Sequence, residues 1–214
     1  SALQILKQNK TTIPKGITRD YPKYEVRGFM LDVGRKSFDF NTVKEFAKNM
    51  AWYKMNNFHL HLSDNLIFLE DYPTMQDAID NAYAGFRLES EIPNLTSEDT
   101  YYTKEEFRSF IKDSRNMGVN IIPEFDMPAH ALAITRAFPN LMTKEAGGNH
   151  RYLIEELDIR KDGALDAAKS VWAQYFQGDD PVFDKDTTVH IGTDEFHGNG
   201  GNEYFRSFSD SMIQ

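Results

Sequence analysis

The chain has 214 residues, and 33 acidic side chains against 24 basic ones give it a formal net charge of −9. This balance argues against a nucleic-acid-binding protein, which needs a basic surface to displace counterions from phosphates, and against a protein held on a membrane by anionic lipid. The chain contains no cysteine, which excludes disulfides, thiolate metal ligands and a cysteine nucleophile. The sequence has no run of about 18 apolar residues, so it predicts no membrane-spanning helix.

Breaker residues and hydrophobic spacing divide the chain into an N-terminal arm, residues 1–22, and a domain over residues 23–214. Within the domain, strand-like and helix-like segments alternate. Thr42 with Glu45 and Thr103 with Glu106 have the spacing of capping boxes at two helix starts. Strands are predicted at residues 26–33, 57–63, 119–125 and 188–193, and helices at residues 42–56, 103–118, 129–138, 165–176 and 202–213.

This alternation predicts an α/β fold with a parallel sheet and helical crossovers. Four βα units fit either a small open sheet or about the first half of a (β/α)8 barrel, which has eight units and about 250 residues. Two long connections, residues 64–102 and 140–162, have the length of binding loops.

Ionisable side chains gather where each predicted strand ends. In a parallel sheet these ends share one rim, so four such clusters predict a site there. Arg27 differs from the others because it stands at the start of the first strand. The clusters are Asp32 and Arg35; His59, His61 and Asp64; Glu124, Asp126 and His130; and Asp194, Glu195 and His197.

The histidines and the first of these acids each admit two interpretations. His59 and His61 lie on one side of their strand. They could be metal ligands or catalytic groups, or they could be buried histidines that only form hydrogen bonds. Asp64 could orient an imidazole or close an Asx turn, and Asp126 could be a helix cap.

Asp194 and Glu195 are neighbours in sequence. Adjacent strand residues point to opposite faces, so these two can share a pocket only where the strand ends. Two close carboxyl groups raise one another's proton affinity, which suits general acid catalysis. An ordinary acidic turn is the alternative.

Four segments in order together resemble glycoside hydrolase family 20, the β-N-acetylhexosaminidases. They are Arg27-Gly-Phe-Met-Leu-Asp-Val-Gly-Arg35, residues 55–64, Pro123-Glu-Phe-Asp-Met-Pro-Ala-His130 and His190-Ile-Gly-Thr-Asp-Glu195. The resemblance implies a TIM barrel, of which this chain covers about the first four βα units. It also implies a retaining mechanism in which the substrate's own 2-acetamido oxygen is the nucleophile.

The resemblance further implies roles for individual residues. Glu195 would be the general acid and base, and Asp194 would hold the acetamido group and steady the charge that develops on it. Asp64 and His130 would form a relay to Glu195. Substrate-binding residues would be Arg27, His61 and Asp32.

A glycosidase of this kind needs no metal or cofactor. Its partner would be a glycan with terminal β-linked N-acetylhexosamine or lacto-N-biose, met outside the cell or at the surface of a bacterium. Residues 61–65 with Phe68-Leu-Glu70 resemble the lacto-N-biosidase branch.

Some positions depart from the family pattern. Asn65 to Phe68 replace a Gln-Gly-Trp-like turn, and Ala129 stands where glycine is usual. The family's aromatic walls come from the second half of the barrel, whereas Trp52 and Trp172 lie on helix stripes. We therefore expect the isolated chain to have little or no activity, and its unpaired strand edges could support a homo-oligomer.

Two other functions remain open at this point. One is a metal-dependent barrel hydrolase that uses His59 and His61. The other is a fragment that binds carbohydrate without cleaving it.

Overall fold

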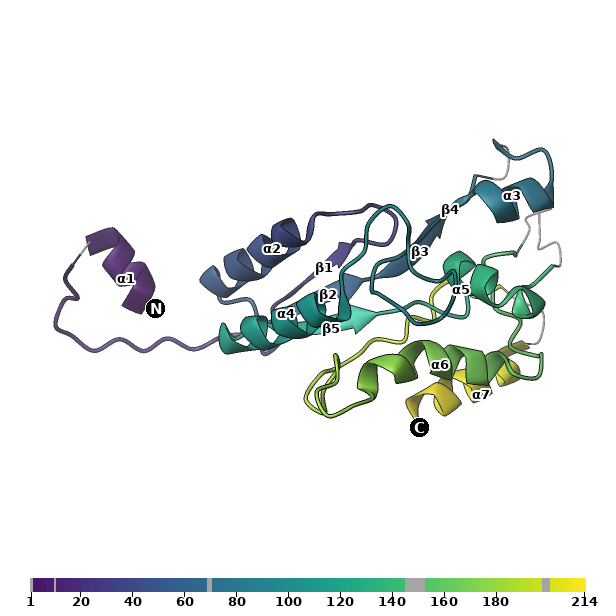
Figure 1. Ribbon diagram of the computed structural model, residues 1–214. Helices are drawn as coiled ribbons and strands as arrows, with labels where there is room; N and C mark the ends of the chain where they lie inside the picture. The colour runs from purple at the N-terminus through teal and green to yellow at the C-terminus, as the bar shows by residue number, and fades with distance from the viewer. Residues whose placement is uncertain (1, 10, 69–70, 145–152, 198–200) are drawn as a thin grey trace.

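The computed structural model describes residues 2–9, 11–68, 71–144, 153–197 and 201–214. Helices and strands alternate along much of this chain, as expected for an α/β protein (Figure 1). The elements are α1 Ala2–Asn9, β1 Gly28–Asp32, α2 Phe40–Trp52, β2 Asn57–His61, β3 Ser63–Leu66, α3 Met75–Asn81, β4 Tyr83–Phe86, α4 Lys104–Asn116, β5 Asn120–Glu124, α5 Leu132–Ala137, the 3-10 helix η2 Pro139–Leu141, α6 Ala164–Phe176 and α7 Gly201–Ile213.

A parallel sheet in the order β1-β2-β5 forms the centre of the fold. Its register places Asp32 opposite His61, and His61 opposite Glu124, so the three carboxyl ends form one row. Phe58 and Leu60 are fully buried on the other face of β2, and the ring of Phe46 from α2 lies 6.4 Å from that of Phe58. The alternation expected for β2 is therefore confirmed.

The predicted fourth strand is wrong for the described residues. Residues 188–193 contribute only a parallel bridge between His190 and Glu124. The backbone then turns through positive φ at Gly192 (75°), Thr193 (88°) and Glu195 (41°). Left-handed conformations cannot continue a ladder of extended backbone, so pairing stops at the bridge.

A second, antiparallel sheet of β3 and β4 follows β2 after a single residue, Leu62. The predicted strand over residues 57–63 is therefore two elements, and the long connection expected over residues 64–102 holds most of this β3–β4 sheet, with α3 between the two strands. Arg87 ties this sheet to the end of β1. It is fully buried and donates from Nε to the carbonyl of Val33 (2.8 Å) and from Nη2 to that of Gly34 (3.1 Å).

The helix starts show which capping signals hold. Thr103 and Glu106 form the predicted capping box of α4. The predicted box at Thr42 is wrong, because α2 begins earlier and Asp39 caps it by accepting from the N–H of Asn41. An aspartate one turn upstream supplies the same oxygen acceptor, so the helix extends back to it.

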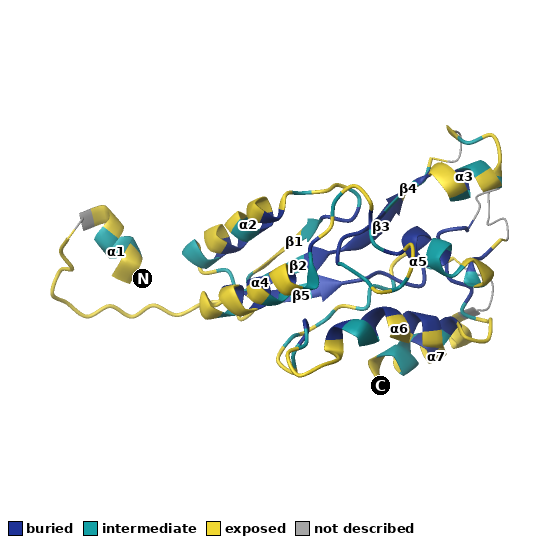
Figure 2. Cartoon of the chain, viewed as in Figure 1, coloured by how far each residue is buried: buried dark blue, intermediate teal, exposed yellow. Residues whose placement is uncertain are grey.

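Buried residues lie along the sheet and on the inner sides of α2, α4 and α6 (Figure 2). Trp172 of α6 belongs to this core, as expected, and its ring lies 4.6 Å from that of Phe125. Trp52 is only half-buried at the end of α2, where Lys7 of α1 lies 4.7 Å from its ring.

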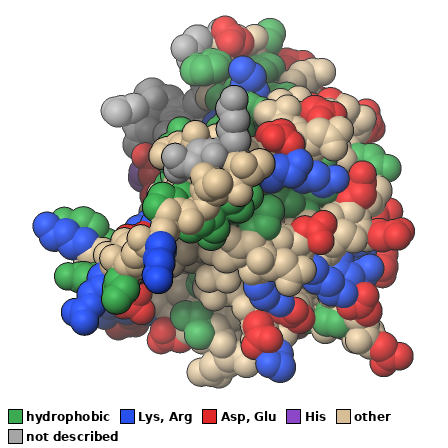
Figure 3. Space-filling view, turned by 90° about the vertical axis from the view of Figure 1, so that its left-hand side faces the viewer, with side chains coloured by type: hydrophobic (Ala, Val, Ile, Leu, Met, Phe, Trp, Pro, Cys, Tyr) green, Lys and Arg blue, Asp and Glu red, His purple; other side chains and the backbone are tan. Residues whose placement is uncertain are grey.

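The expected N-terminal arm contains a helix, α1, followed by the exposed residues 11–22 (Figure 1). Among the residues drawn in colour in Figure 3, acidic and basic side chains are intermixed on this face. Among the described helices, none has the length and apolar content that crossing a bilayer would take.

Candidate active site

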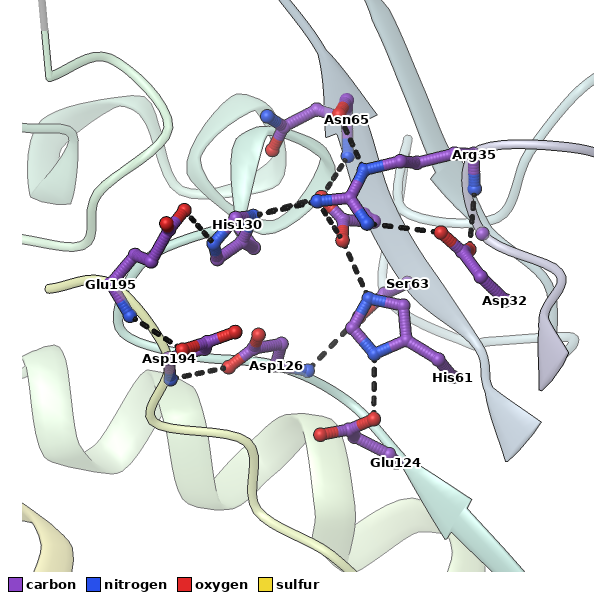
Figure 4. A network of polar contacts seen from close by, with 12 residues as sticks. Asp32, Arg35, His61, Ser63, Asn65, Glu124, Asp126, His130, Asp194 and Glu195 are labelled. Carbon is purple, nitrogen blue, oxygen red and sulfur yellow. Dashed lines mark hydrogen bonds and ion pairs between the residues drawn. The ribbon is translucent and has the colours of Figure 1, made fainter. Parts of the chain in front are cut away.

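A network of polar side chains lies at the carboxyl ends of these strands (Figure 4). Asp64, in β3, is its centre, with a side chain only 1% exposed. One carboxylate oxygen, Oδ1, lies 3.1 Å from His130 Nδ1 and accepts from the N–H of Asn65 at 2.6 Å. The other, Oδ2, lies 2.5 Å from His61 Nε2 and 2.8 Å from Arg35 Nη2. Asp64 therefore does more than close an Asx turn.

His130 connects Asp64 to Glu195. Its Nε2 lies 3.4 Å from Glu195 Oε2, and the expected Asp64–His130–Glu195 juxtaposition is present. The hydrogen bond to Asp64 raises the pKa of His130 above its ordinary value. Arg35 Nη2 also lies 3.2 Å from His130 Nδ1. Because that guanidinium nitrogen has a shorter contact with Asp64, we assign the Nδ1 proton to a hydrogen bond with the carboxylate.

Two residues of this connection have unusual backbones. His130 has φ 56° and Glu195 has φ 41°. Left-handed backbone in a non-glycine residue costs about 1–3 kcal/mol and is concentrated at functional sites. His130 precedes the helix it was expected to open, since α5 begins at Leu132.

Asp126 holds the turn that carries Asp194 and Glu195. Its Oδ1 accepts from the backbone N–H of Thr193 (2.7 Å) and of Asp194 (3.3 Å). Asp126 is therefore not a helix cap, and its burial raises its pKa. Figure 4 shows the Asp194 side chain beside Asp126 and the Glu195 side chain directed at His130. The side chains of Asp194 and Glu195 thus both lie near His130.

A family model described as glycosyl hydrolase family 20, catalytic domain, matches residues 24–209. The chain belongs to glycoside hydrolase family 20. The β-hexosaminidase of Akkermansia muciniphila is 30% identical over 153 residues, which cover 66% of this chain and 30% of that protein. The N,N'-diacetylchitobiase of Vibrio harveyi is 30% identical over 168 residues, covering 71% and 19%.

Solved structures agree with this assignment. A family 20 β-N-acetylglucosaminidase aligns with a TM-score of 0.64 at 25% identity, over 90% of this chain and 41% of that one. The chitobiase of Flavobacterium johnsoniae gives 0.59 at 26% identity, over 91% and 26%. The chain spans less than half the length of each of these relatives. The TIM-barrel fold class is confirmed, and this chain is part of such a barrel.

One family 20 residue expected in the site lies elsewhere. Arg27 stands at the opposite end of β1, where its guanidinium donates to the backbone carbonyls of Lys54, Tyr24 and Glu25. A strand of five residues separates it from the rim, so it does not join Asp32 and the other acids.

Arg35, and not Arg27, is the arginine that lies at the rim with the site residues. It pairs with Asp32 (3.0 Å) and Asp64 (2.8 Å), and its side chain is 36% exposed at the rim. The signal was present in the sequence, since Arg35 follows the end of the strand whereas Arg27 precedes its start.

His61 is also placed differently from the expectation that it binds substrate. It is 5% exposed, and a carboxylate faces each ring nitrogen: Glu124 Oε2 at 2.6 Å from Nδ1 and Asp64 Oδ2 at 2.5 Å from Nε2. Burial disfavours its charge, but these hydrogen bonds outweigh burial and raise the pKa of His61 to about 10. The same network overcomes burial to lower the pKa of Asp64 to about 2 and to lower that of Glu124.

These contacts also weigh against a metal held by His59 and His61. Both nitrogens of His61 are engaged by carboxylates. Ligand atoms of His59, Glu124 and His190 lie within 4.8 Å of one another, but each imidazole is 2.9 or 2.6 Å from Glu124. Ligands around tetrahedral zinc, with bonds of about 2.0–2.1 Å, stand about 3.3 Å apart. These contacts are shorter than that spacing and are ion pairs with Glu124, so we assign no metal here.

The pKa of His61 predicts how stability depends on pH. A folded-state pKa of about 10, above the ordinary 6.5, stabilises the fold fully below pH 6.5 and loses that contribution as pH rises toward 10. Asp64, lowered from 3.8 to about 2, contributes above pH 3.8 and stops contributing as pH falls through 2. Urea unfolding at pH 6, 8 and 9.5 should show a steeper loss of stability in the wild type than in His61→Gln. Parallel profiles would contradict the assignment.

Proposed function

We propose that the protein carrying this chain removes terminal β-linked N-acetylhexosamine from glycans by retaining, substrate-assisted hydrolysis. The observation that carries the proposal is the contact chain Asp64–His130–Glu195, with Asp194 on the same turn as Glu195. The activities named for similar proteins, a β-hexosaminidase and an N,N'-diacetylchitobiase, support it.

In the first step, Glu195 gives its proton to the glycosidic oxygen as the bond to the anomeric carbon breaks. The carbonyl oxygen of the substrate's 2-acetamido group attacks that carbon and closes an oxazolinium ring. The Asp194 carboxylate accepts the acetamido N–H and stabilises the positive charge. Water then attacks the anomeric carbon and returns its proton to Glu195, which restores the acid.

His130 acts on Glu195 through its Nε2. When Glu195 loses its proton, the His130 N–H faces the new carboxylate and stabilises it, while Asp64 keeps the imidazole oriented. The buried Asp64 is fixed by four donors, so the relay has a rigid base.

The leaving sugar is attached to one of three related units. N-acetylglucosamine, N-acetylgalactosamine and lacto-N-biose all present a 2-acetamido group beside the cleaved bond. Leu69 and Glu70, part of the resemblance to the lacto-N-biosidase branch, lie outside the described residues. We therefore propose a specificity for the feature that all three units share, a β-linked N-acetylhexosamine.

The test compares two substrates that differ at one substituent. We expect the natural polypeptide that carries this sequence to hydrolyse an aryl β-N-acetylglucosaminide and to leave the aryl β-glucoside intact, because the latter has no acetamido nucleophile. Equal turnover of both would mean a nucleophile from the protein and would end the substrate-assisted mechanism. We expect far less turnover from the 214-residue chain, because the Glu195 side chain is 64% exposed and a general acid works best where water is excluded.

Arginine variants test which guanidinium serves the sugar. Arg35 uses Nε, Nη1 and Nη2 toward Asn65, Asp32 and Asp64, and its exposed edge has further N–H groups for sugar hydroxyls. We expect Arg35→Ala to lower kcat/KM by about 10-fold or more, as loss of charge-assisted hydrogen bonds does. Arg27→Ala, the matched control, should change kcat/KM less than about 2-fold, because the Arg27 guanidinium donates to backbone carbonyls at the far end of β1. The reverse result would restore Arg27 to the site.

A further inference from the structure

A second imidazole lies beneath the relay and takes no part in the mechanism above. His61 comes from β2, and its side chain is 6% exposed. It stands between the carboxylates of Glu124, at the end of β5, and Asp64, in β3. Both carboxylates are almost fully buried, at 5% and 1% side-chain exposure. Three elements therefore meet at this one ring.

The chemistry of the contacts fixes the charge of the ring. An ionised carboxylate only accepts hydrogen bonds, so an imidazole with a carboxylate at each nitrogen must donate from both and is an imidazolium. A neutral ring would leave one buried carboxylate facing a lone pair, which is strongly unfavourable. The pKa of about 10 for His61, where the two hydrogen bonds outweigh burial, agrees with this state.

We propose that His61 is a positioning residue. Anchored by Glu124, its imidazolium holds the Asp64 carboxylate in place and offsets part of the negative charge that Asp64 presents to His130. The two imidazoles share the same acid, His61 through Oδ2 and His130 through Oδ1. A fixed cation on one side of Asp64 weakens the pull of Asp64 on a proton at the other. The consequence for catalysis rests on the proposed function, whereas the effect on His130 does not.

A test that replaces His61 requires that the other groups bound to Asp64 stay in place. Arg35 would still hold Asp64 at 2.8 Å if His61 were replaced, and the N–H of Asn65 would still donate to it. The electrostatic effect of His61 is therefore separable from loss of the Asp64 position. The titratable and charged groups facing His61, Asp64 and Glu124 are Asp32 at the end of β1, Arg35 after β1, His59 in β2, Asp126 and His130 after β5, and His190.

NMR titration of the histidine side chains tests the proposal without an assay of activity. In the wild type at pH 7.5, the ring nitrogens of His61 should have the 15N shifts of an imidazolium. In His61→Gln, the titration midpoint of His130 should rise by about one pH unit, because a neutral amide replaces a cation on the other side of the shared Asp64 carboxylate. His59→Gln is the matched control. His59 is on the same strand and contacts Glu124 at 2.9 Å, and Glu124 separates it from the Asp64 carboxylate, so His130 should titrate as in the wild type.

The outcomes separate this proposal from the proposed function. A neutral His61 in the wild type at pH 7.5, or an unchanged His130 midpoint in folded His61→Gln, overturns the positioning role whatever the activity. If His61→Gln does not fold, Glu124→Gln carries the test, and the midpoint of His61 should fall by more than about one pH unit. A midpoint shift at His130 in a protein without hexosaminidase activity would leave the positioning role standing and remove the proposed function.

In an active enzyme the same variant has a kinetic signature. His61→Gln should displace the basic limb of the kcat/KM–pH profile to higher pH, in parallel with the NMR midpoint of His130, and should leave KM near its wild-type value. His59→Gln should keep the wild-type profile. A uniform loss of activity at all pH values, with no displacement, would indicate a purely structural role and would contradict the proposal.

Discussion

Replacing Glu195 with glutamine is expected to lower kcat/KM by about 10²–10⁴-fold for an N-acetylhexosaminide with a sugar leaving group. Glutamine keeps the shape of the side chain but has no acidic proton for the glycosidic oxygen. An aryl leaving group with a low pKa departs without that proton, so the loss should be much smaller for such a substrate. The measurement is kcat/KM for the two substrates with the wild type and the variant.

Asp194→Asn is the control for this result. Asp194 serves the acetamido group and not the leaving group, so its variant should lose kcat/KM by a similar factor for both substrates. The same loss on both substrates for Glu195→Gln would contradict its assignment as the acid. A Glu195→Gln variant that binds N-acetylhexosamine as before and loses turnover also separates an enzyme from a fragment that only binds carbohydrate.

Much of this site could be predicted because a parallel sheet brings strand ends together. Asp64, His130 and Glu195 come from three distant segments, yet each follows a segment of buried strand spacing, and the structure joins them through contacts of 3.1 and 3.4 Å. Periodicity identifies such strands, and topology then dictates that their carboxyl ends converge. The burial of α4 and its capping box followed from equally local signals.

The errors have different origins. The family resemblance implied Arg27 as a substrate-binding residue, although its place before β1 already put it at the end of the strand opposite the rim that Arg35 reaches. The run over residues 57–63 looks continuous, although His61 ends one sheet and Ser63 begins another. The resemblance implied that His61 binds substrate, but the register with Glu124 makes it a buried ion-pair partner.

The strand predicted over residues 188–193 was wrong for a different reason. Its apolar residues suggest a strand, but positive φ at Gly192 and Thr193 depends on the contacts of Asp126 with the turn. A tertiary hydrogen bond of this kind is absent from any local pattern. The same contacts put Asp194 and Glu195 where they are, so the feature that defeats the prediction of a strand is part of what builds the site.

Gly192→Ala tests how firmly that turn is fixed. A Cβ at position 192 would lie 2.0 Å from Asp126 Oδ1 and 2.4 Å from the Cα of the same residue, and backbone cannot move aside as the end of a flexible side chain can. Alanine must also adopt φ 75° there, which costs about 1–2 kcal/mol. Gly178→Ala is a matched control, because Gly178 has φ 90° and nothing within 4 Å of the added Cβ.

We expect Gly178→Ala to lose about 1–2 kcal/mol of unfolding free energy and to keep its activity, since it carries only the conformational cost. Gly192→Ala should lose more stability, and its kcat/KM should fall by about 10²-fold or more, because a shift of about 1 Å at Asp194 and Glu195 misplaces both reacting groups. Urea unfolding and kcat/KM measured on both variants make the comparison. Equal effects of the two substitutions would mean that the turn yields to the clash, and that contact with Asp126 does not hold the acid pair in place.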